Sequence, residues 1–178
     1  MKQVIARPSR VAILGAESTG KSTLAAALAR RYRSAWVAEY LREFVETEQR
    51  VPFEADQLRI AQMQMEREDA TAAGTRGLLF CDTTPFMTAL YSTVYWGRID
   101  PALAALDVHH DYAVTLVAAP DVPWVADGLQ RASAAVRQQV HQALVDKLAH
   151  RAIAFTLLTG SLEQRLAQAD AVLKELAV

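Results

Sequence analysis

The chain has a single cysteine, Cys81, among its 178 residues. One thiol cannot form a disulfide within the chain, which is typical of proteins from a reducing compartment. No apolar stretch approaches the length of a transmembrane helix, and the first ten residues, MKQVIARPSR, are too poor in apolar residues for a signal peptide. We therefore predict a cytoplasmic protein that does not act at a membrane.

The chain also has no large excess of positive or negative charge. The chain has 19 Lys and Arg residues against 20 Asp and Glu residues, a formal net charge of −1. Nucleic-acid binding requires a basic face, so this balance gives no electrostatic case for a nucleic-acid partner. Hydrophobic residues make up 52% of the chain, which is ordinary for a globular protein. With no internal repeat and no low-complexity linker, we expect one domain over residues 1–178.

The most informative stretch is GAESTGKST, residues 15–23, which follows an apolar run. The spacing Gly15-x-x-x-x-Gly20-Lys21-Ser22 fits a P-loop. Such a loop aims backbone N–H groups and a helix N-terminus at one anion, and its glycines let the backbone curl closely around that anion. The alternative is a Gly/Ser turn with a chance lysine. The strand-like residues before the motif and the helix-forming residues after it favour the P-loop.

A P-loop gives these residues specific roles in binding ATP. Lys21 would reach the β- and γ-phosphates, and the Ser22 hydroxyl would be a ligand of Mg²⁺. The other nucleotide-binding residues predicted in the loop are Gly15, Glu17, Ser18, Thr19, Gly20 and Thr23.

Apolar runs without strict alternation predict five strands that are buried on both faces, at residues 11–14, 35–38, 78–81, 113–118 and 153–158. Helical segments separate them, at residues 22–32, 41–48, 54–71, 85–95, 132–151 and 162–176. This alternation predicts an α/β fold with a parallel sheet and right-handed crossovers. Ligands of such sheets bind at the carboxyl ends of the strands, so the polar residues after each strand are the candidates for chemistry.

Two carboxylates follow predicted strands. Glu39 opens the segment EYLREF, where it would accept the proton of an attacking hydroxyl or only stabilise the start of a helix. Asp82 ends an apolar strand in the manner of a Walker B motif, where it would hold Mg²⁺ or only cap the next helix. We assign the metal to Asp82 and the acceptor proton to Glu39, and leave the exchange of these roles as the alternative. Tyr40 and Arg42 would shape the acceptor pocket.

A long loop with two prolines and an Asp-Gly pair follows the fourth predicted strand. A loop of this length can close over bound ATP, and we place this lid at about residues 120–137. Arg131, or Arg137 on the helix beyond, would neutralise charge on the transferred phosphoryl group. A plain surface loop is the alternative.

Four stretches in this order, GAESTGKST, EYLREF, CDTTPF and PWVADGL, resemble the ribosylnicotinamide kinase domain of the NadR family. The resemblance covers residues 11–173 and implies a three-layer P-loop fold of the nucleoside-kinase type, also described as an AAA-type ATPase, with strand order 2-3-1-4-5. It further implies that ATP and Mg²⁺ are used to phosphorylate the 5′-hydroxyl of nicotinamide riboside, giving nicotinamide mononucleotide for NAD biosynthesis. Trp124 and Asp127 would contact the substrate.

The chain departs from this family in two ways. Relatives carry an adenylyltransferase domain, and often a DNA-binding helix-turn-helix, before the kinase. In this chain only ten residues precede the first predicted strand, which leaves no room for either domain. We therefore expect neither NAD synthesis by this chain alone nor repressor activity. The lid of relatives reads Asp-Gly-x-Arg, whereas residues 127–131 read DGLQR, which makes Arg131 a weaker assignment than Lys21. A kinase for another nucleoside or nucleotide and a regulatory ATPase are the alternative functions, and monomer and homo-oligomer stay equally open.

Overall fold

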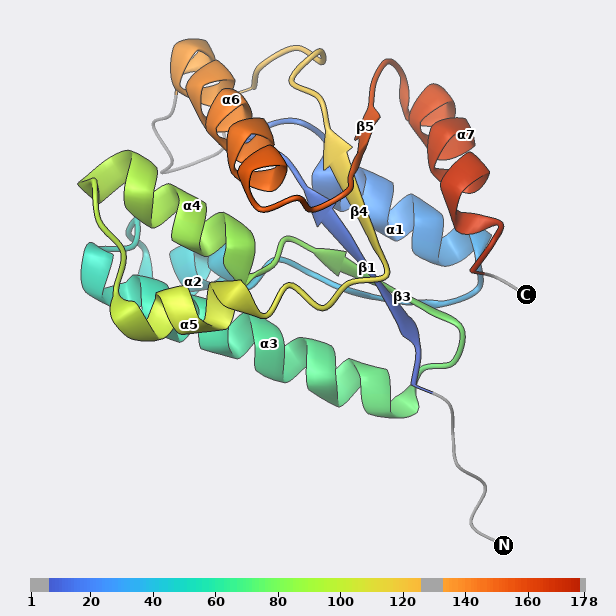
Figure 1. The fold of residues 1–178 in the computed structure, drawn as a ribbon, viewed down its shortest axis with the longest axis horizontal. Coiled ribbons are helices and arrows are strands. Elements are labelled where there is room, and N and C mark those ends of the chain that lie inside the picture. Colours follow the sequence, from blue (N-terminus) through green and yellow to red (C-terminus); the bar gives the residue numbers. More distant parts are fainter. Residues whose placement is uncertain (1–6, 126–132, 177–178) are drawn as a thin grey trace, which may run out of the picture.

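The computed structural model describes residues 7–125 and 133–176, and all structural statements below refer to these. Five parallel strands form one sheet in the order β2-β3-β1-β4-β5, which confirms the expected topology (Figure 1). The strands are β1 (Ser9–Leu14), β2 (Ala35–Val37), β3 (Leu78–Asp82), β4 (Val114–Ala118) and β5 (Thr156–Leu158).

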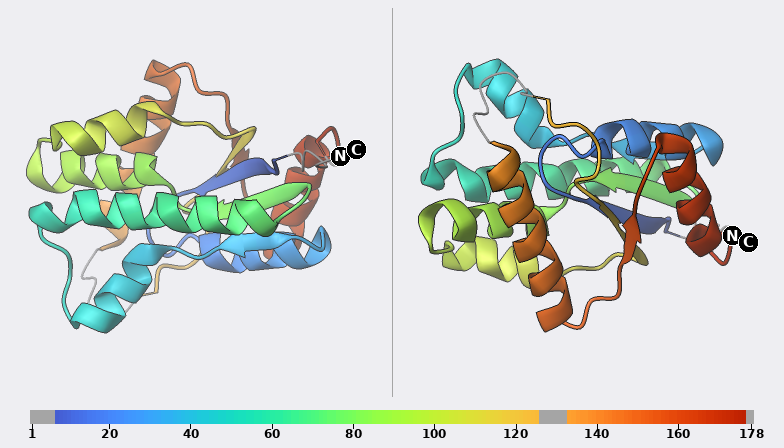
Figure 2. Two further views of the ribbon diagram at one scale, coloured as in Figure 1. Left: turned by 90° about the horizontal axis from the view of Figure 1, so that it is seen from below. Right: turned by 90° about the horizontal axis from the view of Figure 1, so that it is seen from above.

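Helices cover both faces of this sheet, so the molecule has three layers (Figure 2). One face carries α1 (Lys21–Arg31) and α7 (Leu162–Leu173), and the other carries α3 (Gln57–Gly74), α4 (Pro85–Trp96) and α6 (Ala134–His150). The remaining helices, which pack against α3 and α4, are α2 (Tyr40–Glu48), the short 3-10 turn Glu54–Asp56 and α5 (Pro101–Val108).

The central strand β1 is buried on both faces. Val11 and Ile13 pack toward α1 and α7, whereas Ala12 and Leu14 pack toward α4 and α6. All four side chains are fully buried, which explains why the strand shows no alternation of apolar and polar residues. Burial of an aliphatic side chain of this size stabilises the fold by about 1.5–3 kcal/mol, so this strand anchors the loop that follows it.

The sequence prediction missed the helix α5 and placed some boundaries wrongly. Asp100 begins α5 as its N-cap, with a carboxylate oxygen 2.7 Å from the backbone N of Ala102, and Pro101 occupies the first helical position. This Asp-Pro pair was the available signal. The strand predicted at 153–158 begins only at Thr156, because residues 149–153 turn back on the preceding helix. None of the helices within residues 7–125 and 133–176 combines the length and apolar character needed to cross a membrane.

A buried carboxylate ties α3 to the start of the sheet. The Glu68 side chain is 0% exposed, accepts a hydrogen bond from the Tyr112 hydroxyl at 2.8 Å and lies 3.5 Å from the Arg10 guanidinium. Burial raises the pKa of this carboxyl to about 7 against an ordinary value of 4.5, although Tyr112 and Arg10 oppose the shift. The folded protein therefore holds a proton here that the unfolded chain releases.

We predict that Glu68→Gln flattens the pH dependence of stability. Between pH 4.5 and about 7 the folded state binds more protons than the unfolded state, so the free energy of unfolding falls as the pH rises through this window. Each pKa unit is worth about 1.4 kcal/mol, so the fall amounts to at most about 3 kcal/mol. Urea denaturation at about pH 5 and about pH 8 measures it. Glu66→Gln, at an exposed position of the same helix, is the control and keeps the wild-type slope; a wild-type slope in Glu68→Gln would contradict the assignment.

Candidate active site

The loop between β1 and α1 has the tight backbone that the glycine spacing predicts. Gly20 is the N-cap of α1 at φ 81°, in the left-handed region that favours glycine. A Cβ built on Gly15 would lie 2.8 Å from the Thr19 hydroxyl and 3.0 Å from the backbone oxygen of Ala118. Glycine at position 15 therefore permits the loop to pack directly against the end of β4.

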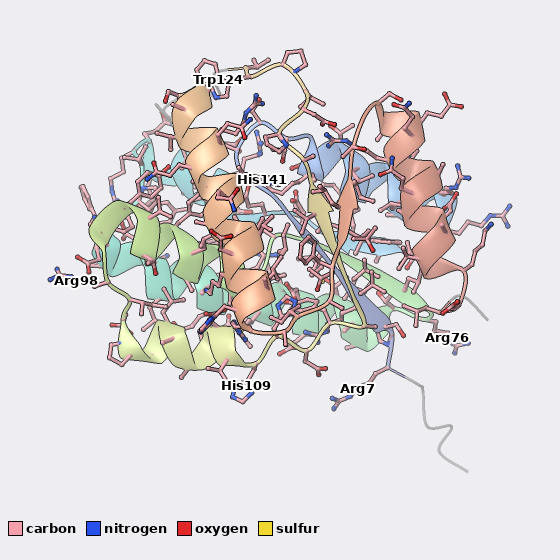
Figure 3. All side chains as sticks on the ribbon, turned by 45° about the horizontal axis from the view of Figure 1, so that its top comes forward. Arg7, Arg76, Arg98, His109, Trp124 and His141 are labelled. Carbon is pink, nitrogen blue, oxygen red and sulfur yellow. The ribbon has the colours of Figure 1, made fainter. Side chains whose placement is uncertain are left out.

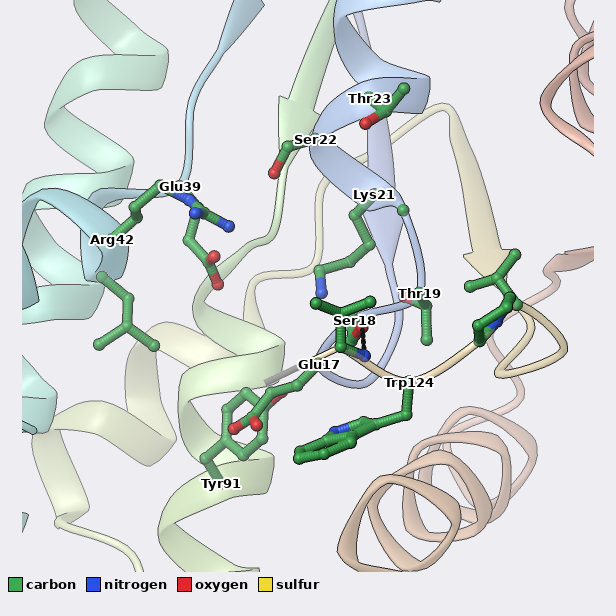
Figure 4. Close-up of a pocket in the computed structure, with 15 residues that line it drawn as sticks. Glu17, Ser18, Thr19, Lys21, Ser22, Thr23, Glu39, Arg42, Tyr91 and Trp124 are labelled. Atoms are coloured by element: carbon green, nitrogen blue, oxygen red, sulfur yellow. Dashed lines mark hydrogen bonds between the residues drawn. The ribbon is translucent and has the colours of Figure 1, made fainter. Parts of the chain in front are cut away.

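The Lys21 ammonium lies inside the curl of this loop. Its Nζ donates to the backbone oxygen of Ala16 at 2.9 Å, and the Thr19 hydroxyl donates to the same oxygen at 2.8 Å. Lys21 is a buried residue that also lines the cleft in front of the loop (Figure 4). A buried ammonium at a helix N-terminus is an arrangement that attracts an anion.

A cleft of about 380 Å³ opens in front of the loop, a size suited to a small-molecule ligand. Three further segments complete its wall: the start of α2, the middle of α4 and the loop after β4. The lining residues are residues 17–23 of the loop, Glu39, Leu41, Arg42, Tyr91, Val122, Pro123, Trp124 and Val125. The cleft lies at the carboxyl ends of the strands, far from Arg7 and His109 at the other end of the molecule (Figure 3).

Asp82 is bonded to Ser22, which lines this cleft. The Ser22 hydroxyl donates to Oδ2 of Asp82 at 2.6 Å, although the two residues lie 60 positions apart. Asp82 is 1% exposed, and its other oxygen, Oδ1, has no hydrogen-bond partner within the described residues. Burial raises the pKa of this carboxyl, and the nearby Lys21 ammonium opposes the shift. A hydroxyl beside a carboxylate with an unpartnered oxygen fits the oxygen ligands that Mg²⁺ prefers.

Glu39 faces the same space from the neighbouring strand. It is the N-cap of α2, yet its side chain makes no capping hydrogen bond, and its carboxyl points toward Lys21 (Figure 4). Its backbone is one of the groups that lower the pKa of Asp82. Burial raises the pKa of Glu39, Asp82 adds to the rise, and Lys21 opposes it. The two acids predicted after neighbouring strands are therefore brought together beside one lysine.

Two arginines hold the outer side of the glycine loop. Arg165, 3% exposed, donates to the backbone oxygens of Thr19 at 2.5 Å, Ala119 at 2.9 Å and Gly160 at 3.0 Å, and pairs with Asp121. The sequence analysis missed this residue. Its position three residues after Leu162, inside the apolar stripe of a helix, was the available signal.

Arg137 performs a similar role from α6. Its Nη1 donates to the backbone oxygens of Ser18 at 3.2 Å and Val122 at 2.8 Å. The Ser18 hydroxyl in turn accepts from the backbone N–H of Val125 at 3.0 Å, which joins the loop after β4 to the glycine loop. Two other predicted site residues, Asp127 and Arg131, belong to the segment predicted as a lid and lie outside the described residues.

Aromatic side chains form another part of the wall of the cleft. Tyr91 and Trp124 both line the cleft near Glu17 (Figure 4). Tyr91 stacks on Tyr95 with ring centroids 5.8 Å apart, and the Tyr95 hydroxyl lies 3.5 Å from Oε1 of Glu17. Tyr91 belongs both to the hydrophobic core and to the lining of the cleft.

Tyr40 and Arg42, both predicted to shape the acceptor pocket, occupy different environments. Arg42 lines the cleft. Tyr40 is buried in a hydrophobic cluster with Phe44 and Ile60, and its ring lies 4.7 Å from the Arg67 guanidinium. The Tyr40 ring is therefore not among the side chains that line the cleft, because the start of α2 turns it toward α3.

The parallel sheet, the glycine loop after its first strand and the acids after its second and third strands define a P-loop protein with a kinase-like fold. The chain belongs to the AAA domain family, whose model matches residues 10–165.

Curated relatives point to a narrower group. The chain is 31% identical over 150 residues to the "Trifunctional NAD biosynthesis/regulator protein NadR" of Escherichia coli K12, a match that covers 82% of this chain and 37% of that protein. It is also 31% identical over 140 residues to the protein of the same name from Salmonella typhimurium LT2, covering 76% of this chain and 34% of the relative. The chain thus spans about a third of the length of these relatives.

Solved structures share the fold over nearly the whole chain. NadR in complex with NAD and AMP-PNP superposes with a TM-score of 0.80 at 22% identity and covers 96% of this chain and 50% of that one. NadR in complex with NR gives 0.78 at 22% identity, with 96% and 52% covered. Deoxyadenosine kinase from M. mycoides gives 0.56 at 12% identity, with 94% and 98% covered.

We predict that Gly15→Ala damages the site whereas Gly74→Ala does not. A methyl group at position 15 overlaps Thr19 and the backbone of Ala118, whereas one at position 74 meets nothing within 4 Å. Overpacking costs about 1–3 kcal/mol, so we expect ATP affinity to fall about tenfold and the melting temperature to drop by several degrees. Calorimetric titration with ATP and thermal melts measure both. Equal ATP affinity in the two variants would show that the loop does not require the close approach of Gly15 to Thr19 and Ala118.

Proposed function

We propose that this chain is an ATP-dependent kinase that phosphorylates the 5′-hydroxyl of nicotinamide riboside and gives nicotinamide mononucleotide. The observation that carries the proposal is a cleft lined by Lys21 of the glycine loop, Glu39 and two aromatic rings, with Asp82 bonded to the lining residue Ser22. The similarity to NadR supports this choice of substrates, since one solved NadR structure contains NR and another contains NAD and AMP-PNP.

The nucleotide would bind with its phosphates in the glycine loop. Backbone N–H groups of the loop, the N-terminus of α1 and the Lys21 ammonium would hold the β- and γ-phosphates. Ser22 and Asp82 would hold Mg²⁺, whose remaining ligands would be phosphate oxygens and water. When bound, the ion would neutralise the charge that develops on the transferred group.

The acceptor would occupy the side of the cleft between Glu39 and the aromatic wall. The ring of nicotinamide riboside is a pyridinium cation, and the faces of Tyr91 and Trp124 attract cations. The carboxylate of Glu17 adds negative charge beside these rings. A cationic riboside is thus better matched to this wall than a neutral nucleoside is.

With both substrates bound, phosphoryl transfer would mainly require alignment of the 5′-hydroxyl with the γ-phosphate. The 5′-oxygen forms a bond to the γ-phosphorus, the bond from that phosphorus to the β,γ-bridging oxygen breaks, and ADP leaves. In a loose transition state the hydroxyl keeps its proton until late, so Glu39 orients the hydroxyl and takes the proton at its carboxylate. Asp82 would hold the metal together with Ser22, whose hydroxyl it contacts.

An acceptor panel tests this function. We expect rapid ADP release with nicotinamide riboside and Mg·ATP, at least about tenfold faster than with adenosine, deoxyadenosine, cytidine or no acceptor. Lys21→Ala should abolish the transfer in a protein that still folds, because Lys21 supplies charge to phosphate and not packing to the core. Equal ADP release without any acceptor would indicate an ATPase, and preference for another nucleoside would reassign the acceptor.

A pair of variants separates the roles of the two acids. Glu39→Gln should lower kcat by roughly 10²–10⁴-fold and leave ATP affinity nearly unchanged, since it removes a proton acceptor. Asp82→Asn should raise the Mg²⁺ concentration needed for half-maximal rate, since it weakens a metal ligand. Rates against Mg²⁺ concentration and ATP titrations distinguish the two. If Glu39→Gln were the variant that shifts the Mg²⁺ curve, the two roles would have to be exchanged.

A further inference from the structure

The side chain of Gln64 joins the two segments that carry Glu39 and Asp82. Gln64 lies in α3 and is 1% exposed, although its amide is polar. Its Oε1 accepts from the backbone N–H of Tyr40 at 2.8 Å, and its Nε2 donates to the backbone oxygen of Asp82 at 3.5 Å. One buried amide therefore contacts the residue after the first acid and the backbone of the second.

The contact with Tyr40 satisfies a backbone donor at the start of α2. The first N–H groups of a helix have no partner within the helix. Tyr40 is the first residue of α2, and its N–H is bonded by Gln64. Glu39, the N-cap of α2, makes no side-chain capping bond of its own. Gln64 thus fixes the backbone directly after Glu39.

Gln64 contacts Asp82 at a point beyond the last paired residues of β2 and β3, where the sheet no longer sets the spacing of the two strands. The register of β2 and β3 ends at the pair Val37 and Cys81, one residue before Asp82 and two before Glu39. Beyond this pair the chains separate into α2 and the loop before α4. Gln64 reaches both of them from a helix that packs on β2, α2 and α4.

We propose that Gln64 is a positioning residue that fixes Glu39 relative to Asp82 and so sets the rate of phosphoryl transfer. It acts through the two backbones and not on the phosphates. The proposal rests on the kinase function proposed above. Misplacement of a reacting group by about 1 Å can cost about 10²-fold in rate, which gives the scale of the effect.

Gln64 also lines a small cavity of about 10 Å³ beside the cleft, together with Glu39, Thr83 and Tyr91. This position raises a second possibility, a direct contact with the acceptor. The two roles differ in kinetics. A positioning residue affects kcat, whereas a residue that only binds the acceptor affects its KM.

The test compares Gln64→Met with Gln62→Met. Methionine at position 64 keeps the length of the side chain but removes both hydrogen bonds; position 62 is exposed on the same helix and serves as the control. We expect Gln64→Met to lower kcat at least about tenfold, with the KM values for ATP and acceptor within about threefold of wild type. Gln62→Met should match the wild type.

A second variant covers the case in which Gln64→Met does not fold. Gln64→Leu also lacks both the oxygen that accepts from Tyr40 and the N–H that donates to the Asp82 backbone, so it should also lower kcat with little change in KM. Melting temperatures establish folding of each variant. An unchanged kcat in a folded variant, or a raised acceptor KM at constant kcat, would overturn the positioning role.

A failure of the proposed kinase function can be distinguished from a failure of the Gln64 proposal. If the wild-type protein hydrolyses ATP and transfers nothing to nicotinamide riboside, the kinase proposal is wrong. The ratio of wild-type to variant kcat for hydrolysis then still decides whether Gln64 positions the acids, because hydrolysis uses the same metal and phosphate site.

Discussion

A buried lysine ammonium beside two buried carboxyls is the interaction on which the site depends. Lys21 opposes the rise in pKa that burial imposes on both Glu39 and Asp82, so the three groups stabilise one another's charge. Arg42 also lowers the pKa of both acids, so two cations act on two carboxyls at this point. In the proposed kinase, a magnesium ion would add positive charge beside Asp82 and the nucleotide phosphates would add negative charge beside Lys21.

The backbone N–H groups of a glycine loop face inward, so its carbonyl oxygens face outward and need hydrogen-bond donors. In this chain the donors come from the far end of the sequence: Arg137 bonds the oxygen of Ser18, and Arg165 bonds the oxygen of Thr19. A buried carbonyl without a donor would cost about 1–3 kcal/mol. The C-terminal helices thus hold the shape of an N-terminal loop, and the same arginines join that loop to the segment after β4.

Sequence reasoning could find those parts of the site that carry a local pattern. The P-loop spacing, the apolar strands and the acids after two of them were all visible, and the strand order followed from the family resemblance. Arg165 and Gln64 were missed because their partners are distant: the bond from Arg165 to Thr19 spans 146 residues. Tyr40 shows the reverse error, since a residue next to a site residue can still point into the core.

The central claim is that the cleft transfers the γ-phosphoryl group to a sugar hydroxyl and not to water. Phosphorus NMR of a reaction with Mg·ATP and nicotinamide riboside tests this directly. The account predicts a phosphomonoester resonance that is coupled to the two 5′ protons of the riboside and grows in step with ADP. Growth of inorganic phosphate alone, with the riboside unchanged, would contradict it.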